Sequence, residues 1–223
     1  MAKDFCNPQV VEGYDLHIRK LIPGYQLVHQ QILAILQAHL SQDAHVLIVG
    51  VGTGYELGYL LQAFPRCRFT VTELSQPMLD KAKDYVALWN NDNRVNFILG
   101  SHIDFEHSPQ FDAVLSILVT HFIPFEHKLE FMQAARRCMK MNGIFLTFDL
   151  TQFSFKQEAE ALQQMCLMNG LLEKQVQAMQ SRMQDDFYAL STHETFNLLR
   201  EAGFVQVHSF TQVLSYQGFI AQY

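Results

Sequence analysis

The 223-residue chain lacks several features that would assign it to a specialised class of protein. No apolar run approaches the roughly 20 residues that a membrane-spanning helix needs, and the N-terminal segment has no apolar stretch of the kind found in secretory signals. The four cysteines are scattered and form no C-x-x-C pair, so neither a zinc knuckle nor a redox dithiol is indicated. We therefore expect a cytoplasmic protein with free thiols, no metal site and no membrane association.

Positive charge is also scarce. Lys and Arg together number 16 against 22 Asp and Glu, which gives a formal net charge of -6 at pH 7. Proteins that hold long nucleic acids by their phosphates usually carry an excess of basic residues. The charge balance therefore argues against direct binding of long nucleic acids, although the net charge does not exclude a local basic patch.

An alternation of strand-like and helix-like patterns is the main feature that the sequence does contain. Length and composition predict one globular domain over residues 1–223. Strand and helix patterns alternate up to Asp149, which predicts an α/β layered fold with right-handed crossovers. The strands are expected at 46–49, 67–72, 95–99, 111–118 and 144–148. The helices are expected at 25–40, 55–63, 75–89 and 126–140, with Asn142-Gly143 ending the last of them.

The two ends of the chain depart from this alternation. Residues 1–25 form a lead-in before the first regular pattern, and residues 151–190 are predicted to be an insertion containing two helices. Ser191 to Glu194 have the pattern of a capping box, which begins a helix that ends at Gly203. Two strand-like runs follow, at 204–210 and 215–223. Because the connection between them is short, they are expected to pair antiparallel.

A glycine-rich loop follows the first predicted strand. The apolar run Val46–Val49 leads into Gly50, Gly52 and Gly54, and a helical pattern comes next. Glycine allows a positive φ and close approach of a ligand to the backbone, and a helix N-terminus offers free N–H groups to a carboxylate or phosphate. The sequence therefore predicts a nucleotide-type site at this loop.

The spacing of the glycines distinguishes between two classes of cofactor. A dinucleotide-binding loop, G-x-G-x-x-G/A, requires a small residue at the position occupied by Tyr55. Here the pattern is G-x-G-x-G, and Glu73 stands at the tip of the next predicted strand. An acidic side chain at that point can accept hydrogen bonds from both hydroxyls of a ribose.

With these features the sequence resembles the class I S-adenosylmethionine-dependent methyltransferases over nearly its whole length. The resemblance implies an α/β fold with a Rossmann-like seven-stranded sheet, the last strand antiparallel, helices on both faces and the helical insertion after the fifth strand. It implies an enzyme with S-adenosylmethionine as cofactor, S-adenosylhomocysteine as product and a small-molecule acceptor. The matching segments are 46–54, 71–79, 111–116, 139–143 and 199–204.

The resemblance also assigns cofactor contacts to particular residues. The methionine part would lie over the glycine loop and beside the end of the fourth strand, the ribose on the acidic strand tip, and the adenine between the following helix and residues 101–103. The contacts implied are Gly50, Val51, Gly52, Gly54, Glu73, Leu74, Met78, Ser101, His102, Ile103, Ile117 and Leu118.

The ends of the chain resemble a subgroup of this family that includes carboxy-S-adenosylmethionine synthase, an enzyme that prepares a cofactor for tRNA modification. In that subgroup the N-terminal segment folds over the cofactor, which adds Tyr14, Arg19 and Tyr25 to the implied contacts. The synthase has an arginine that holds the extra carboxylate of its product, and Leu198 stands at the matching position. This departure favours the ordinary cofactor over the carboxylated one.

A second departure concerns the adenine. The family usually carries an aspartate after the third strand, where this chain has Ser101. His102 or Asp104 are the substitutes within reach in the sequence.

The residues that act on the acceptor are less clearly marked. His121 follows the fourth strand, at the edge where open α/β sheets bind ligands, and is either a general base or a hydrogen-bonded structural histidine. A base is optional, because the cofactor contains its own good leaving group and positioning supplies much of the rate. The remaining alternatives are a synthase of the carboxylated cofactor and a cofactor-binding module without transfer activity.

Methionines recur at helical spacing in the insertion. Such residues most often belong to a core. Alternatively they form a lid over an apolar acceptor, or the surface of a homodimer. They are Met165, Met168, Met179 and Met183.

Overall fold

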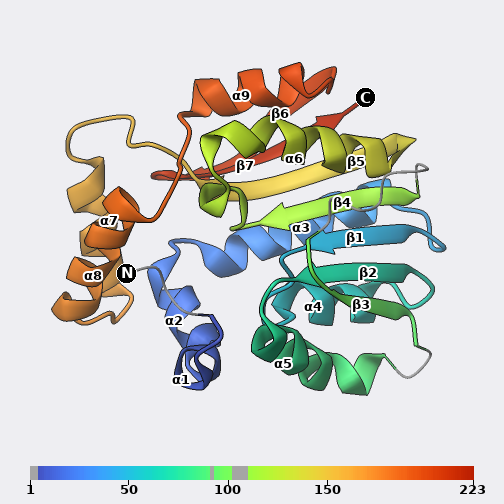
Figure 1. Cartoon of the computed structure of the whole chain (residues 1–223), viewed down its shortest axis with the longest axis horizontal. Coiled ribbons are helices and arrows are strands. Elements are labelled where there is room, and N and C mark those ends of the chain that lie inside the picture. The colour runs from blue at the N-terminus through green and yellow to red at the C-terminus, as the bar shows by residue number, and fades with distance from the viewer. Residues whose placement is uncertain (1–4, 91–92, 102–109) are drawn as a thin grey trace.

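The computed structural model describes residues 5–90, 93–101 and 110–223. Its centre is a seven-stranded sheet with the strand order β3-β2-β1-β4-β5-β7-β6 (Figure 1). The first five strands run parallel, and β7 is antiparallel to both β5 and β6. This confirms the predicted sheet with its antiparallel last strand. The strands are β1 (His45–Val49), β2 (Arg68–Glu73), β3 (Val95–Leu99), β4 (Phe111–Ile117), β5 (Met139–Leu150), β6 (Gln206–Val213) and β7 (Tyr216–Gln222).

Helices cover both faces of the sheet, as predicted. Apolar side chains of α3, α4 and α5 form one buried cluster with the strands, and those of α6 and α9 form another. The helices are α1 (Pro8–Glu12), α2 (Tyr14–Leu21), α3 (Tyr25–His39), α4 (Tyr55–Ala63), α5 (Gln76–Val86), α6 (Phe125–Cys138), α7 (Glu158–Met168), α8 (Glu173–Asp185) and α9 (Thr192–Glu201), with short 3-10 turns η1 (Ala87–Trp89) and η3 (Thr120–Phe122). No helix of the described part of the chain is long and apolar enough to cross a membrane.

Local sequence signals set several of these boundaries. The Ser75 hydroxyl accepts a hydrogen bond from the Met78 N–H, and Pro77 stands in the first turn of α5. At α9 the predicted capping box is confirmed: Ser191 accepts from the Glu194 N–H, and the Glu194 side chain accepts from the Ser191 N–H. Two helices, α7 and α8, form the insertion after β5, also as predicted.

The boundary between α6 and β5 differs from the prediction. The helix ends at Cys138 rather than at Asn142-Gly143, and β5 begins at Met139. Met139 pairs with Phe111 of β4, and the register shifts between Phe111 and Ala113. A side chain at Gly143 would come within 3.1 Å of the Phe111 carbonyl oxygen. Gly143 therefore allows an irregular stretch of β5 to approach β4 closely. In the sequence, the same Asn142-Gly143 pair resembles the end of a helix.

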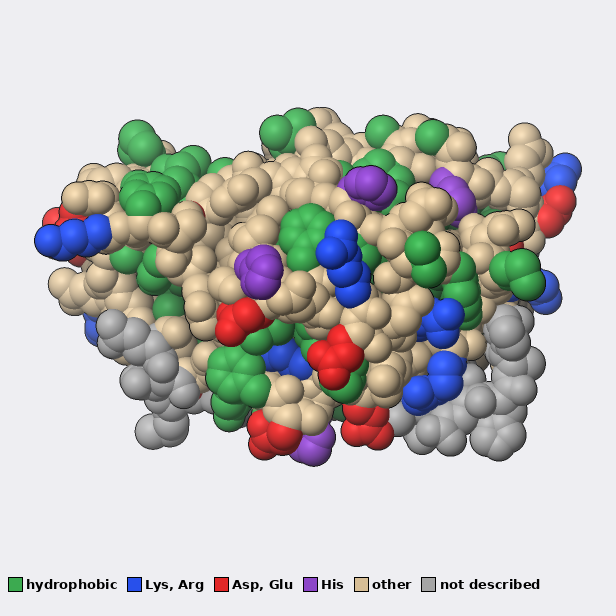
Figure 2. Space-filling model, turned by 90° about the horizontal axis from the view of Figure 1, so that it is seen from above, with side chains coloured by type: hydrophobic (Ala, Val, Ile, Leu, Met, Phe, Trp, Pro, Cys, Tyr) green, Lys and Arg blue, Asp and Glu red, His purple; other side chains and the backbone are tan. Residues whose placement is uncertain are grey.

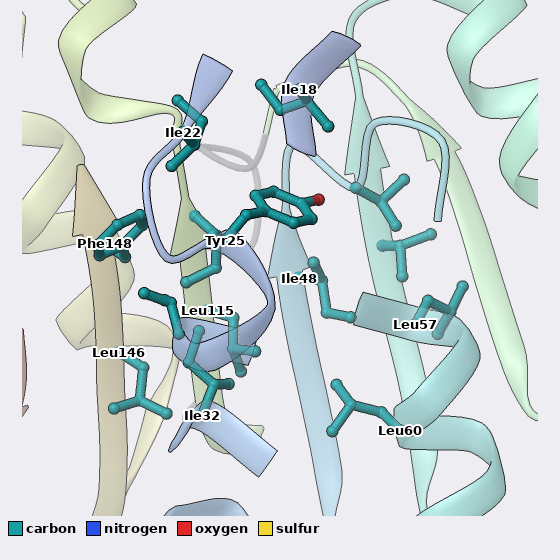
Figure 3. Close-up of a cluster of buried hydrophobic side chains, with 14 of the residues drawn as sticks. Ile18, Ile22, Tyr25, Ile32, Ile48, Leu57, Leu60, Leu115, Leu146 and Phe148 are labelled. Atoms are coloured by element: carbon teal, nitrogen blue, oxygen red, sulfur yellow. The ribbon is translucent and has the colours of Figure 1, made fainter. Parts of the chain in front are cut away.

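The lead-in is anchored in the main core. Ile18, Ile22 and Tyr25 are buried against Ile48 of β1 and Leu115 of β4 (Figure 3). Burial of each such side chain contributes on the order of 2 kcal/mol. The lead-in is thus a fixed part of the fold over its described residues.

The lead-in and the insertion meet at the same end of the sheet. In Figure 1, α2, α7 and α8 lie at the end toward which β4 points. This is the carboxyl edge of the parallel strands, where open α/β sheets bind ligands. On the face shown in Figure 2, Lys and Arg side chains are interspersed with Asp and Glu.

Candidate active site

The glycine loop between β1 and α4 is held in a left-handed conformation. Gly50, Gly52 and Gly54 have φ values of 70°, 55° and 87°. A Cβ on Gly54 would lie 3.1 Å from Ala82, so this glycine allows α4 and α5 to approach closely. A Cβ on Gly52 would meet no atom within 4 Å. Gly52 therefore presents bare backbone to open space, as a ligand-binding loop requires.

Glu73 ties this loop to the tip of β2. Its Oε2 accepts a hydrogen bond from the Gly52 N–H at 3.0 Å, and its Oε1 accepts from the N–H groups of Leu74 and Ser75 at 2.9 and 3.0 Å. A carboxylate oxygen has two acceptor sites, so Oε2 keeps capacity for a further donor such as a ribose hydroxyl. This geometry is compatible with ribose binding by Glu73, which stays a prediction.

A cavity beside the loop gathers most of the residues predicted for the methionine part of the cofactor. It is lined by residues 50–53, by Ile117 and Leu118, and by Tyr14 and Tyr25 of the lead-in. Leu118 has a φ of 59°, an uncommon conformation for a branched side chain and of the kind that concentrates at functional sites. Residues from three segments that are distant in the sequence therefore meet at one point.

The same cavity contains two buried groups that sequence reasoning missed. Glu56 is 6% exposed, and burial raises the pKa of its carboxyl to about 8. Burial, with a smaller contribution from Arg19, lowers the pKa of His29 to about 3. The Nδ1 of His29 contacts the Tyr59 hydroxyl at 3.1 Å, and its Nε2 has no hydrogen-bond partner among the described residues. A buried acid and an unpaired ring nitrogen fit the ammonium and carboxylate of an amino-acid ligand.

Arg19 lies one layer away from this cavity. Its guanidinium stacks over the rings of Tyr55 and Tyr25, at 4.2 and 5.6 Å from their centroids. Arg19 is not among the residues that line the cavity. Arg19 therefore contacts Tyr25, a residue that lines the cavity. A direct contact between Arg19 and the cofactor stays a prediction.

The lead-in is also fastened to the loop by polar contacts. The Thr53 hydroxyl donates to Asp15 at 2.5 Å, and Lys81 of α5 forms an ion pair with Asp15 at 3.3 Å. Lys81 donates as well to the carbonyl of Val11 at 2.9 Å, and the Ser75 hydroxyl donates to the carbonyl of Phe5 at 2.7 Å. These contacts hold the lead-in over the glycine loop and the tip of β2.

The predicted adenine contacts are only partly described. Leu74 is 77% exposed, whereas Met78 is buried in the core. Of the two, only the Leu74 side chain is accessible to an adenine ring. Ser101 is exposed. His102, Ile103 and the substitute Asp104 lie outside the described residues.

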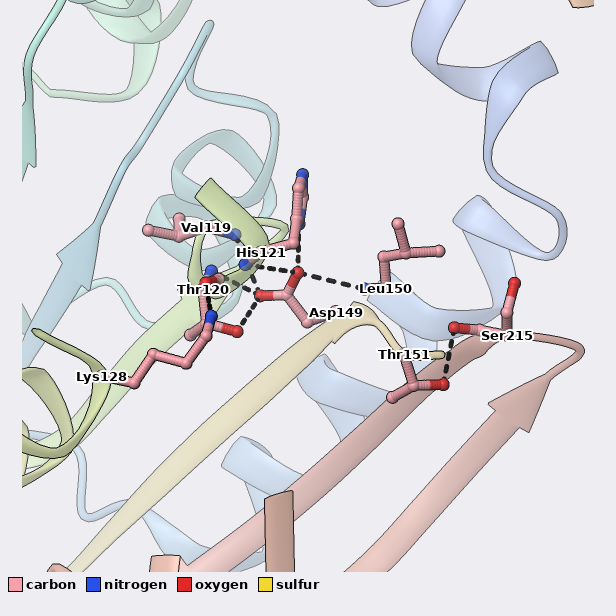
Figure 4. Close-up of polar contacts among 8 residues, drawn as sticks. All are labelled: Val119, Thr120, His121, Lys128, Asp149, Leu150, Thr151 and Ser215. Carbon is pink, nitrogen blue, oxygen red and sulfur yellow. Dashed lines mark hydrogen bonds and ion pairs between the residues drawn. The ribbon is translucent and has the colours of Figure 1, made fainter. Parts of the chain in front are cut away.

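A second polar centre lies at the carboxyl ends of β4 and β5 (Figure 4). The Oδ2 of Asp149 accepts from the N–H groups of Val119 and Thr120 at 3.2 and 2.6 Å and from the Thr120 hydroxyl at 2.6 Å. Its Oδ1 accepts from the N–H groups of His121 and Leu150 and from Nδ1 of the His121 ring. With its Nδ1 proton directed at Asp149, His121 keeps Nε2 free to accept a proton.

The electrostatics of this centre follow from burial and pairing. Burial alone would raise the pKa of Asp149, but His121 and the hydrogen bonds from Thr120 outweigh it and lower that pKa. Lys128 is only 3% exposed and donates to the Thr120 carbonyl. Burial lowers the pKa of Lys128 to about 8, with Asp149 opposing the shift. No pattern in the sequence indicates a role for Lys128.

Next to His121 lies a cavity of about 530 Å³. This is within the range of roughly 300–1,000 Å³ that small-molecule sites occupy. Its walls come from α1, α2, η3 and α8, and Tyr14 and Leu118 line both this cavity and the one at the glycine loop. The two cavities are therefore neighbours. We call the larger one the acceptor cavity.

Aromatic rings surround His121 in this cavity. Its ring lies 4.1 Å from Phe122 and 4.6 Å from Phe187, centroid to centroid, and Phe5 lies 5.8 Å from Phe122. Of the insertion methionines, Met179 and Met183 line the cavity, whereas Met168 is 77% exposed. The insertion thus contributes a cavity wall.

Comparison with known proteins gives three findings. Residues 47–145 match a family described as a methyltransferase domain. The chain is 24% identical to carboxy-S-adenosyl-L-methionine synthase of Desulfotalea psychrophila, over 99% of this chain and 92% of that protein. Among solved structures it is similar to a phosphoethanolamine N-methyltransferase of Haemonchus contortus, with a TM-score of 0.68, 17% identity and coverage of 94% of this chain.

The solved structures bear on the fold alone. Human N-acetylserotonin methyltransferase is a further match, with a TM-score of 0.58, 14% identity and coverage of 87% of this chain. The chain spans 45% of the length of the Haemonchus protein and 51% of the human one. The Haemonchus structure contains S-adenosylhomocysteine, and the human structure contains S-adenosylmethionine.

Proposed function

We propose that the chain is a class I S-adenosylmethionine-dependent methyltransferase, as its similarity to a methyltransferase domain family and to a related synthase supports, and that it methylates a small molecule bound in the acceptor cavity. The observation that carries the proposal is the position of His121. It lines the acceptor cavity beside Leu118, which also lines the glycine-loop cavity. An acceptor at His121 would therefore lie next to a cofactor on the glycine loop.

The residues present suit the cofactor. The open side of Gly52, the buried Glu56 and the unpaired Nε2 of His29 match the backbone, ammonium and carboxylate contacts of its amino-acid end. Glu73 would hold the ribose, as the resemblance implies. When bound, the cofactor supplies an electrophilic methyl group on a sulfonium.

His121 would act on the acceptor. Asp149 fixes the imidazole with the proton on Nδ1, so Nε2 can take a proton from an acceptor O–H or N–H as the heteroatom attacks. Asp149 also stabilises the imidazolium that results. The aromatic rings around His121 would keep water away from the reacting atoms.

Identification of the bound ligand is the first test. The protein is purified from cells and denatured, and the released small molecule is weighed. S-adenosylmethionine or S-adenosylhomocysteine is expected. Failure of both to be released, together with no calorimetric binding at millimolar concentration, would refute the proposal.

The second test addresses His121. His121→Gln should lower the rate of methyl transfer from labelled cofactor by about 10²- to 10⁴-fold, with cofactor affinity unchanged. His208→Gln is the matched control, because His208 is exposed on β6. Equal rates in the two variants would remove His121 from the mechanism.

Synthesis of the carboxylated cofactor is the second candidate function. It is supported by the similarity to the Desulfotalea synthase over almost the whole chain. Leu198 on α9, partly buried among apolar residues, offers no charge to an extra carboxylate. The same mass measurement decides, because the carboxylated ligand is heavier by one carboxylate. Transfer of label to any metabolite of a cell extract would exclude a binding module without activity.

We also propose that the protein works in the cytoplasm and does not hold long nucleic acids. Four free cysteines and a net charge of -6 support these two proposals. A homodimer would use the exposed side of the insertion, which includes Met168. Light scattering of the purified protein tests the dimer directly.

A further inference from the structure

Arg182 places a positive charge in the wall of the otherwise mostly apolar acceptor cavity. It stands on α8, with 20% of its side chain exposed. Its Nε donates to the carboxylate of Asp186 at 3.4 Å, and its guanidinium lies 5.1 Å from the centroid of the Phe187 ring. No other described residue accepts a hydrogen bond from it. The two terminal nitrogens of Arg182 are thus available to a ligand.

Arg182 and His121 both line the cavity and both contact the ring of Phe187. The His121 ring packs edge-on against Phe187 at 4.6 Å, and Arg182 lies over that ring. Because both groups contact one ring, a small ligand in the cavity can reach both of them. The apolar and aromatic lining around them favours a ligand with an apolar body between its polar ends.

We propose that the methyl acceptor is an aromatic carboxylic acid whose carboxylate binds Arg182 and whose nucleophilic O–H or N–H faces His121. Its ring packs among Phe5, Phe122 and Phe187. The inference rests on the proposed function and names the class of acceptor. In the reaction the acceptor heteroatom forms a bond to the methyl carbon, the carbon–sulfur bond breaks with its electron pair on sulfur, and the acceptor proton passes to Nε2 of His121.

The arrangement of Arg182 favours a carboxylate over a neutral group. The guanidinium presents its N–H groups as a planar fork that matches a carboxylate bidentately. Asp186 contacts only Nε and at a long distance, so it orients the fork and leaves the outer edge open. In a largely apolar wall, a neutral acceptor would leave these donors unsatisfied, which disfavours its binding.

Uncharged polar side chains offer the competing possibility. Gln9 and Gln175 also line the cavity and can bind a neutral polar group. The affinity of a neutral acceptor would depend on these two amide side chains and not on the charge of Arg182. The two possibilities give opposite results in a binding experiment.

The experiment compares acids with their own amides. Wild-type protein is saturated with S-adenosylhomocysteine and titrated calorimetrically with benzoate, cinnamate and 2-naphthoate, and separately with the three primary amides. At least one acid is expected to bind tenfold or more tightly than its amide. Arg182→Gln should weaken binding of that acid by about 10- to 100-fold and leave the amide unaffected.

Two further variants make the result interpretable. Lys174→Gln removes a positive charge from an exposed position on the same helix and should change nothing. Arg182→Lys keeps the charge without the planar fork, and an intermediate affinity is expected, which also serves if Arg182→Gln fails to fold. Equal affinity for acids and amides, an equal loss of both in Arg182→Gln, or no binding of any acid would overturn the inference.

Failure of the proposed function gives a different result. If S-adenosylhomocysteine does not bind, the proposed methyltransferase activity fails on that measurement alone. The titration with acids and amides can still be made without it, and its outcome then decides the role of Arg182 by itself.

Discussion

Substitution of Glu56 by glutamine should stabilise the protein at alkaline pH and leave it unchanged at acid pH. Glu56 is buried beside the glycine loop, and burial raises its pKa from 4.5 to about 8. The folded state thus holds a proton that the unfolded state releases above pH 4.5. Stability from this group is complete below pH 4.5 and is lost progressively as pH rises toward 8. Glutamine has no proton to lose and avoids this penalty.

The size of the effect follows from the shift. Each unit of difference in pKa corresponds to about 1.4 kcal/mol, so a shift from 4.5 to about 8 amounts to roughly 3–5 kcal/mol at pH 8. This is a large part of the roughly 5–15 kcal/mol by which a domain is stable. Other titrating groups are shared by the two proteins and cancel in the difference.

Urea denaturation at pH 5, 6.5 and 8 measures the effect. The stability difference between Glu56→Gln and wild type should be under about 1 kcal/mol at pH 5 and should grow with pH. Glu160→Gln, an exposed acid on α7, is the control and should follow wild type at every pH. A Glu56→Gln variant that is less stable than wild type at pH 8, or a difference that does not depend on pH, would refute the reasoning.

Three further predictions concern the cofactor and the base. Binding of S-adenosylmethionine at pH 7 should release a proton, because an ammonium group beside Glu56 favours the ionised form of its carboxyl. The calorimetric binding enthalpy of the wild-type protein should then vary with the ionisation enthalpy of the buffer. The binding enthalpy of Glu56→Gln should not vary with the buffer. Asp149→Asn should lower the methyl-transfer rate by about 10²- to 10⁴-fold and the free energy of unfolding by about 3–5 kcal/mol. The pKa of Asp149 is lowered in the folded state, so wild-type protein loses stability when this carboxylate is protonated. The difference in stability between wild type and Asp149→Asn should therefore shrink as pH falls below about 4. Gly54→Ala and Gly52→Ala should each cost about 1–2 kcal/mol of stability in urea, because both glycines have a positive φ. Gly54→Ala should cost more, because its Cβ meets Ala82, whereas only Gly52→Ala should also reduce calorimetric cofactor affinity, because its Cβ enters open space beside the loop; the reverse pattern would contradict the assignment of the loop.

The fold could be predicted from the sequence because its signals are local. Periodicity marked the strands and helices, and the Ser191 capping box marked the start of α9. The error at Gly143 has the opposite origin. Asn-Gly after a helical pattern indicates a helix stop locally, but the pairing of Met139 with Phe111 extends β5 to that point. Tertiary pairing of the strand outweighed the local signal.

The candidate site could be predicted only where it coincides with a motif. The glycine loop and Glu73 have a spacing that can be recognised. Glu56 lies one residue after Tyr55 in the same motif, yet its chemistry depends on burial, which the sequence does not display. Asp149 could have been suspected as a charged residue at the carboxyl end of an apolar strand, because that edge carries the ligand site. Its partnership with His121 depends on β4 and β5 being neighbours.

The two segments that depart from the alternating pattern depend on one another for the site. Lys20 of α2 donates to the Gly170 carbonyl of the insertion at 3.3 Å, and the Lys20 carbonyl accepts from Asn169 at 3.3 Å. At the other end of α2, Asp15 accepts from Thr53 of the glycine loop. One short helix therefore links the loop predicted to hold the cofactor with the wall of the acceptor cavity. Because the same helix contacts both the insertion and the glycine loop, we expect cofactor and acceptor binding to be thermodynamically coupled.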